Sequence, residues 1–138
     1  MNAFEKRMAL SDVVIGNKFW TVISVTGSFA QLASKEPATF LNDPLPFEFN
    51  KFVDYELGYE GISSGSGNIT FADDLNMKHE GRKSKLYNFY AAFSNYDDAL
   101  AYIDMINSDK LPDDLRAVRD ALVARSQKNR DTFDDWDY

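Results

Sequence analysis

The sequence changes from a strand pattern to a helix pattern at one point, Ser94, and this change limits the fold class. Before Ser94, short segments rich in β-branched and aromatic residues alternate with polar turns, which is typical of strands. After Ser94, apolar residues recur every three to four positions, which is typical of amphipathic helices. Strands followed by helices predict an α+β fold, with the helices on one face or one end of a mostly antiparallel sheet.

About five strands are expected before Ser94. The clearest pattern is at Val53–Tyr59, where apolar side chains alternate with acidic side chains and one glycine. Lys18–Val25 has apolar residues on both faces, which predicts a central strand covered on both sides. A turn at Thr26–Ser28 and a returning strand at residues 29–33 would complete a hairpin. The other expected strands are Ile69–Phe71 and Leu86–Phe93, and the five could close into a small barrel.

Three segments are expected to lie outside the strands. Residues 2–10 could form a short helix that docks through Phe4 and Met8, four positions apart on one face. Residues 34–46 contain three prolines, so we expect an irregular connection there. Residues 73–85 are expected to form a polar loop that ends in a basic cluster.

Two amphipathic helices are expected after this point. Ser94 is the expected N-cap of the first helix, with Asp97 completing a capping box. The second helix is expected to start at Pro112 and to end near Arg130, with basic residues at its negative end. Its apolar seam could pack against the protein's own sheet or against a second copy. The two stripes are Tyr96, Ala99, Leu100, Ile103 and Ile106, and then Leu111, Leu115, Val118 and Leu122.

Residues 1–130 are expected to form one compact domain, because 138 residues is a typical length for a single domain. Residues 131–138 have no helix-supporting pattern and are expected to form a separate tail. The formal net charge of the chain is −7, and four of these charges lie in the tail. The charged and aromatic residues of the tail are Asp131, Phe133, Asp134, Asp135, Trp136, Asp137 and Tyr138.

Composition excludes several classes of protein. Without cysteine there is no disulfide framework, thiolate nucleophile or zinc ribbon, and a single histidine allows no His-pair metal site. No apolar run approaches the roughly 20 residues of a membrane span, and the N-terminal residues lack a signal-peptide core. A net charge of −7 disfavours a general duplex-DNA binder. We therefore expect a cytoplasmic protein with no cofactor, no bound metal and no membrane partner.

Two patterns could suggest an enzyme, but neither is sufficient. Residues 61–65 match G-x-S-x-G, but Gly-Ser-Gly-Asn follows where a nucleophile elbow needs a helix. Asp54, Glu56 and Glu60 could hold a divalent cation in a hydrolase or nuclease, but an alternating strand with one solvated face gives the same pattern. We therefore expect no catalytic residues and a protein that is not an enzyme.

The acidic, aromatic tail is suited to capture by a basic groove with an apolar pocket on a protein partner. The charges would raise the rate of encounter and the rings would supply most of the affinity. The tail resembles the acidic, aromatic-ended C-terminal tails of bacterial and phage single-stranded-DNA-binding proteins, although it lacks the terminal Pro-Phe of the bacterial form. The sequence thus favours a binding protein, such as a phage-type inhibitor or accessory factor. Mimicry of nucleic acid by its carboxylates is one form of this hypothesis.

The alternative hypothesis is a single-stranded nucleic-acid binder. A basic loop beside exposed aromatic residues can hold phosphates while the bases stack on the rings. Aromatic residues in strands are more often part of a core, and the basic residues would then only solubilise a loop. The residues of the nucleic-acid alternative are Lys78, His79, Arg82, Lys83, Lys85, Tyr87 and Phe89, with Phe93 expected on the same strand face as Tyr87 and Phe89.

Overall fold

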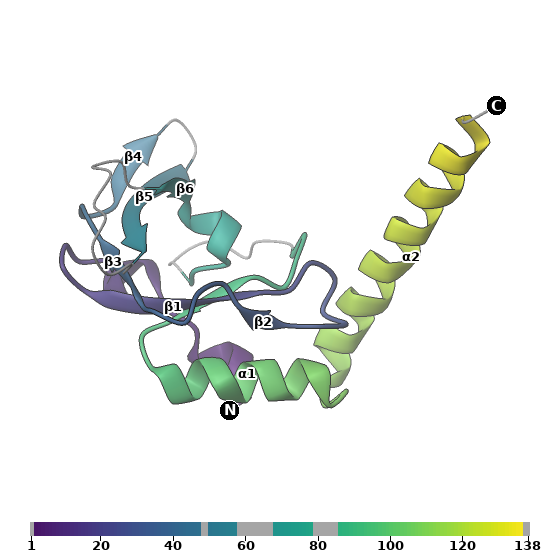
Figure 1. Cartoon of the computed structure of the whole chain (residues 1–138), viewed down its shortest axis with the longest axis horizontal. Helices are drawn as coiled ribbons and strands as arrows, with labels where there is room; N and C mark the ends of the chain where they lie inside the picture. Colours follow the sequence, from purple (N-terminus) through teal and green to yellow (C-terminus); the bar gives the residue numbers. More distant parts are fainter. Residues whose placement is uncertain (1, 48–49, 58–67, 79–85, 137–138) are drawn as a thin grey trace.

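The computed structural model describes residues 2–47, 50–57, 68–78 and 86–136, and it confirms the predicted α+β fold. A seven-stranded sheet is followed by two helices (Figure 1). Every pairing between these strands is antiparallel. The strands are β1 (Lys18–Ile23), β2 (Gln31–Leu32), β3 (Ala38–Phe40), β4 (Leu45–Phe47), β5 (Asn50–Leu57), β6 (Asn68–Phe71) and β7 (Ala91–Phe93), and the helices are α1 (Tyr96–Asn107) and α2 (Asp113–Trp136).

The sheet is not closed, so the small barrel considered from the sequence is wrong. The strand order β2-β1-β3-β5-β4 leaves β2 and β4 at opposite ends, while β6 pairs with β5 and β7 pairs with β1. A barrel requires its two outer strands to meet and pair. Here β2 has two residues and β4 has three, and they do not pair with each other.

Strand β1 lies at the centre of the sheet and contributes to two separate cores. It pairs with β2, β3 and β7, and Val22 is opposite residues of both β2 and β7. Side chains alternate between the two faces of a strand, so Phe19 and Val22 point to opposite sides. Each of them is fully buried, in a different cluster. The prediction of a central strand with buried residues on both faces is confirmed, but the strand ends at Ile23 and Val25, which was expected to be covered, is 64% exposed.

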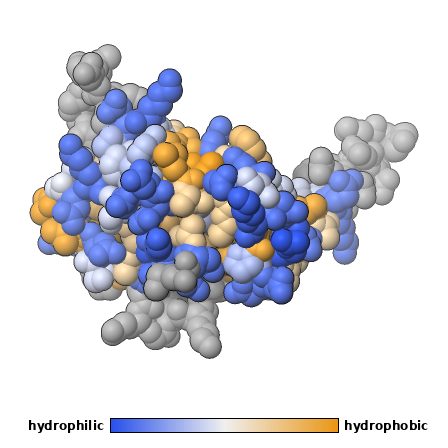
Figure 2. Space-filling model, turned by 90° about the horizontal axis from the view of Figure 1, so that it is seen from below, coloured by the Kyte–Doolittle hydropathy of each residue, from blue (hydrophilic) through white to orange (hydrophobic). Residues whose placement is uncertain are grey.

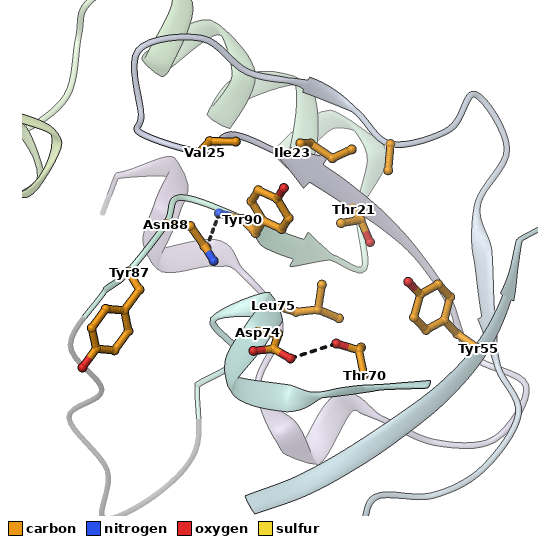
Figure 3. Close-up of a pocket in the computed structure, with 11 residues that line it drawn as sticks. Thr21, Ile23, Val25, Tyr55, Thr70, Asp74, Leu75, Tyr87, Asn88 and Tyr90 are labelled. Atoms are coloured by element: carbon orange, nitrogen blue, oxygen red, sulfur yellow. Dashed lines mark hydrogen bonds between the residues drawn. The ribbon is translucent and has the colours of Figure 1, made fainter. Parts of the chain in front are cut away.

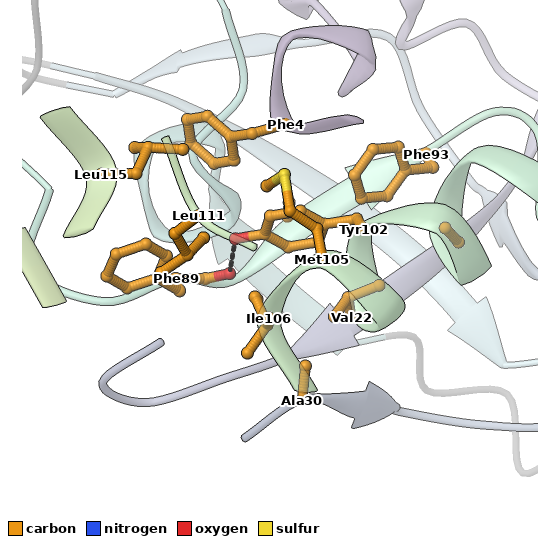
Figure 4. Close-up of a cluster of buried hydrophobic side chains, with 12 residues drawn as sticks. Phe4, Val22, Ala30, Phe89, Phe93, Tyr102, Met105, Ile106, Leu111 and Leu115 are labelled. Atoms are coloured by element: carbon orange, nitrogen blue, oxygen red, sulfur yellow. Dashed lines mark hydrogen bonds between the residues drawn. The ribbon is translucent and has the colours of Figure 1, made fainter. Parts of the chain in front are cut away.

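The helix-side core lies between β1, β7 and α1 (Figure 4). Tyr102 is at its centre, with its ring 5.5 Å from that of Phe4 and 5.4 Å from that of Phe93. Its hydroxyl donates a 2.7 Å hydrogen bond to the carbonyl oxygen of Phe89, so the buried polar atom is satisfied. The buried members are Phe4, Val22, Ala30, Phe89, Ala91, Phe93, Ala99, Tyr102, Met105, Ile106, Leu111 and Leu115.

The strand-side core lies on the other face of β1, where β3, β5 and short 3-10 helices meet. The rings of Phe19 and Phe40 stack at 4.1 Å, and Tyr55 meets Phe19 edge-on at 5.5 Å. Met8 belongs to this core, whereas Phe4 belongs to the helix-side core. The expectation that residues 2–10 form one helix with both side chains on one docking face is therefore wrong. They form a 3-10 turn at Ala3–Lys6, and Leu10–Asp12 form another. The buried members are Met8, Val13, Phe19, Ala38, Phe40, Val53, Ala72, Leu75, Met77 and Ala92.

Residues 34–46 were expected to be irregular, but they contain β3 and the start of β4. Ala38 and Phe40 are buried in the strand-side core, and this burial stabilises β3 despite its short length. Pro46 is opposite Lys51 in the β4–β5 pair. Proline is tolerated in a strand that has a neighbour on only one side, because its missing N–H can face solvent. Pro46 therefore lies in an edge strand, whereas Pro37 and Pro44 lie in irregular backbone, as expected.

Of the predicted strand Leu86–Phe93, only Ala91–Phe93 is a strand. Backbone groups of Asn88 and Tyr90 bond to side chains, while the N–H of Phe89 still bonds to the carbonyl oxygen of Ser24. The Nδ2 atom of Asn76 donates to the carbonyl oxygen of Tyr90 at 2.6 Å and to Oδ1 of Asn88 at 2.9 Å. Asn88 Oδ1 also accepts from the backbone N–H of Tyr90 at 2.9 Å. Asn76 is buried and has a φ of 52°, a conformation that asparagine tolerates better than most residues. These bonds hold residues 86–90 in an irregular path.

Helix α1 starts one residue later than predicted and is turned relative to the predicted stripe. Asn95 is the N-cap, since its side chain accepts from the N–H of Asp97 at 2.8 Å, so Ser94 is not the cap. Tyr96 and Leu100 are about two-fifths exposed, whereas the predicted stripe placed them inside. The residues of α1 that are buried are Ala99, Tyr102, Met105 and Ile106.

Helix α2 packs through its first turns and then extends away from the rest of the protein (Figure 1). Leu111 and Leu115 are buried in the helix-side core, and Val118 and Leu122 pack against it. The predicted seam is therefore confirmed, and it meets the chain's own core. The helix continues to Trp136, so the predicted end near Arg130 is wrong, and its last turn contains no basic residue.

Candidate functional site

A groove of about 540 Å³ opens on the strand side of β1 (Figure 3). Thr21, Ile23 and Val25 lie on the same side of β1 and its continuation as Phe19, so the groove extends the strand-side core toward solvent. Its volume lies within the range of about 300–1,000 Å³ that is usual for ligand pockets. The lining residues are Thr21, Ile23, Val25, Ala33, Tyr55, Thr70, Asp74, Leu75, Tyr87, Asn88 and Tyr90.

One wall of the groove is the irregular segment that Asn76 holds in place. Besides its side-chain bonds to residues 88 and 90, Asn76 accepts a 2.6 Å hydrogen bond from Arg7 Nε through its carbonyl oxygen. Phe89, in the middle of this segment, turns away from the groove into the helix-side core. Tyr87 and Tyr90 are left to line the groove, and Tyr87 is 68% exposed.

The described lining of the groove contains one carboxylate among apolar, tyrosine and neutral polar side chains. Oδ2 of Asp74 accepts a 3.2 Å hydrogen bond from the hydroxyl of Thr70, and Asp74 is exposed (Figure 3). The Tyr55 hydroxyl is protonated at physiological pH and can donate a hydrogen bond, and burial raises its pKa further above the ordinary value. The lining therefore combines one negative charge with three aromatic rings.

The structure separates the residues proposed for nucleic-acid contact. Phe89 is 0% exposed and lies against Gly27, so it cannot stack on a base, and this part of the alternative is wrong. Phe93 is also buried, so the interpretation as core residues is confirmed for both. Lys78 is exposed, and its ammonium donates a 2.7 Å hydrogen bond to the carbonyl oxygen of Glu5. His79, Arg82, Lys83 and Lys85 lie outside the described residues.

The two patterns considered for catalysis lie only partly within the described residues. The backbones of Asp54 and Glu56 lie in β5, while Glu60 and residues 61–65 are outside the described part of the chain. Among the described residues, no group of three histidine, cysteine, aspartate or glutamate residues is placed to hold a metal ion. None of the helices in the described ranges is long and apolar enough to cross a membrane.

Six of the eight tail residues continue α2 instead of following it as a separate segment. Asp131–Trp136 have a helical backbone, and Asp137 and Tyr138 lie outside the described residues. Phe133 follows Leu115 by eighteen positions, which is five turns at 3.6 residues per turn. The positions of Phe133 and Trp136 are thus on the same side of the helix as the docked seam, beyond the part that packs.

The α1 side of the molecule carries an apolar area surrounded by polar residues (Figure 2). On α1, Tyr96 and Leu100 are about two-fifths exposed, and the Tyr96 ring lies 5.5 Å from that of Trp20.

Residues 7–106 match the family model described as Phage g100-like protein. The chain belongs to this family. No curated protein and no solved structure matches the chain. The match covers most of the sequence and marks a phage-type protein. All of the residues that line the groove fall within it, whereas α2 lies beyond its end.

The groove was not predicted from the sequence, although the alternation of residues that forms one of its walls was recognisable. Thr21, Ile23 and Val25 alternate with Trp20 and Val22, which predicts one face of a strand. That pattern does not indicate whether the face is covered. The space depends on the irregular path of residues 86–90, which the side chain of Asn76 fixes from a distant part of the chain.

Proposed function

We propose that this phage-type protein is a non-enzymatic binding factor whose C-terminal helix engages a basic groove with an apolar pocket on a protein partner. The observation that carries the proposal is the division of α2 into two halves. The first half packs against the helix-side core, and the second half continues as a helix away from it (Figure 1). An accessory factor or inhibitor of a host protein would act through such a helix end.

The charge at the end of α2 supports a basic partner. Asp131, Asp134 and Asp135 lie in the last two turns, and Asp137 follows. A helix has a partial negative charge at its C-terminal end, so carboxylates there are unfavourable. Asp131 and Asp135 are also four positions apart, a spacing at which like charges repel by a few tenths of a kcal/mol. A positively charged surface would relieve both effects.

The aromatic positions support an apolar pocket inside that basic surface. Phe133 and Trp136 are three positions apart, so they lie on one side of the helix. Aromatic anchors of this kind account for much of the affinity in protein interfaces, and charges at the rim mainly raise the rate of association.

Pull-down from a bacterial lysate followed by measurement of binding to the purified captured protein would test the proposal. Phe133→Ala with Trp136→Ala should abolish capture, and Asn at positions 131, 134, 135 and 137 should weaken it, more so as salt is lowered. Val123→Ala is the control, because Val123 is exposed on another side of α2.

Equal capture by all of these variants would contradict the proposal. Binding of a labelled single-stranded oligonucleotide at low salt, unchanged in the α2 variants, would favour the nucleic-acid alternative instead. In that case, Lys78 and the basic residues that follow it would be the next residues to substitute.

A further inference from the structure

From the groove's shape and charge, we infer that it is a docking site for an arginine-bearing peptide segment of a protein partner, with the guanidinium held between Tyr90 and Asp74. The site is separate from the end of α2, and the inference does not rest on the proposed function of that helix.

The charge of the groove lining determines whether a cationic or an anionic ligand is favoured. Among the residues that the structure describes, Asp74 is the one carboxylate that lines the groove, and no basic side chain lines it. Thr70 donates to one oxygen of Asp74, and no other described residue donates to the second oxygen. A carboxylate held by one neighbour is oriented and can still accept from a ligand. A cation is therefore favoured, and an anion is disfavoured by the same charge.

The aromatic rings favour a planar cation. Tyr55, Tyr87 and Tyr90 supply three rings to one surface, with Tyr90 between the other two along the groove (Figure 3). A guanidinium stacks on aromatic faces and can donate two parallel hydrogen bonds to a carboxylate. An ammonium is a compact, strongly hydrated charge and gains less from such a surface.

The open end of the groove favours a chain over an enclosed small molecule. Val25 and Tyr87 both line the groove, and they are 64% and 68% exposed. Ile23 and Leu75 add apolar surface further in. A ligand can therefore extend past the cation site in contact with apolar side chains, as a peptide with apolar residues beside its arginine would.

The walls are held in place before any ligand binds. Asn76 fixes the backbone at residues 88 and 90, and Tyr55 packs edge-on against Phe19 of the strand-side core. Ordering these groups on binding would cost little, because their positions are already set by hydrogen bonds and packing.

The test is a titration of the ¹⁵N-labelled full-length protein with a leucine–arginine–leucine tripeptide amide, followed by amide chemical shifts. Its twin carries citrulline, which keeps the shape of arginine without the charge. We expect saturable shifts at Ala33, Asn88 and Tyr90 at about millimolar concentration, and roughly three- to tenfold weaker binding of the twin.

Asp74→Asn should make the two peptides bind equally, whereas Glu36→Gln, which changes an exposed acid outside the groove, should keep the difference. Tyr90→Leu should weaken the arginine peptide about two- to tenfold, and Tyr90→Phe should restore it. The amide spectrum shows whether each variant is folded, and the comparison of the two peptides on the unchanged protein needs no variant.

Three results would overturn the inference. The first is equal binding of the arginine and citrulline peptides to the unchanged protein. The second is the absence of saturable shifts in the groove, or their appearance only elsewhere. The third is binding of benzamidinium, a small planar cation, as tight as that of the tripeptide, which would identify a small-molecule site and not a peptide site.

Discussion

The two faces of β1 are covered to different extents. On one face, Val22 and Ser24 are buried beneath α1 and the chain that precedes β7. On the other face, Phe19 is buried, but the burial decreases through Ile23 to the exposed Val25. The helix-side face therefore contributes mainly to stability, while the strand-side face provides an accessible surface. A single six-residue strand serves both purposes because its side chains alternate.

Substitutions on the two faces should have very different costs. Phe93→Ala removes a fully buried ring from the helix-side core and should lower the free energy of unfolding by about 3–5 kcal/mol. Ile23→Ala in the groove should cost about 1 kcal/mol or less, since solvent can fill the space. Urea denaturation measures both. Equal costs would show that the strand-side face is as tightly packed as the other.

Substitution of two glycines with similar φ angles separates the cost of backbone strain from the cost of crowding by an added Cβ. Gly16 and Gly27 have φ values of +87° and +86°, but only at Gly27 would a Cβ meet another group, the Phe89 ring at 2.8 Å. Gly16→Ala should cost about 1–2 kcal/mol for the backbone alone. Gly27→Ala should cost roughly 2–4 kcal/mol, because it adds overpacking against the helix-side core. Similar losses in thermal denaturation would show that Phe89 can move aside.

The Tyr102 hydroxyl is expected to matter more than an exposed tyrosine hydroxyl. Tyr102→Phe leaves the buried carbonyl oxygen of Phe89 without its donor and should cost about 1–3 kcal/mol. Tyr87→Phe should change stability by less than about 0.5 kcal/mol, because that side chain is exposed. Chemical denaturation of both variants checks the contrast, and a Tyr102→Phe variant of full stability would contradict it.

Alkaline pH should act on the buried Tyr102 hydroxyl and on that of the half-buried Tyr55. Burial raises the pKa of Tyr102 and of Tyr55 above the ordinary value of 10.0. Above pH 10 the unfolded chain loses these protons before the folded chain does, so stability should fall as pH rises further. Denaturation between pH 8 and 11 measures the slope, which should be shallower in Tyr102→Phe. An unchanged slope would assign the effect to other groups.

The smallest effect is expected at the start of α1, the helix that covers the closed face. Asn95→Ala removes the N-cap and should cost about 1 kcal/mol, while Ser94→Ala should cost close to nothing. Denaturation of the pair decides between the structure's cap and the one expected from the capping-box pattern. A larger loss in Ser94→Ala would restore the sequence prediction.

The parts of the fold that follow from local patterns could be predicted from the sequence. The alternation in β5, the two apolar faces of β1 and the seam of α2 all depend on spacing within one segment. Residues 86–90 could not be predicted, because their path depends on Asn76, whose bonds cross 12 and 14 positions of the chain. The same limit applies to the groove, which exists only where β1, β5 and that segment meet.

Distant hydrogen bonds also affect how the chain can fold during synthesis. The side chain of Asn107, the last residue of α1, donates to the carbonyl oxygen of Ala30 and accepts from its N–H, across 77 positions. Ribosomes add about 5–20 residues per second, so the β1–β2 hairpin must wait roughly 4–15 seconds for this partner. During that delay the apolar residues of β1 that β7 and α1 later cover remain accessible. These side chains can therefore be buried in the helix-side core only after α1 has been made.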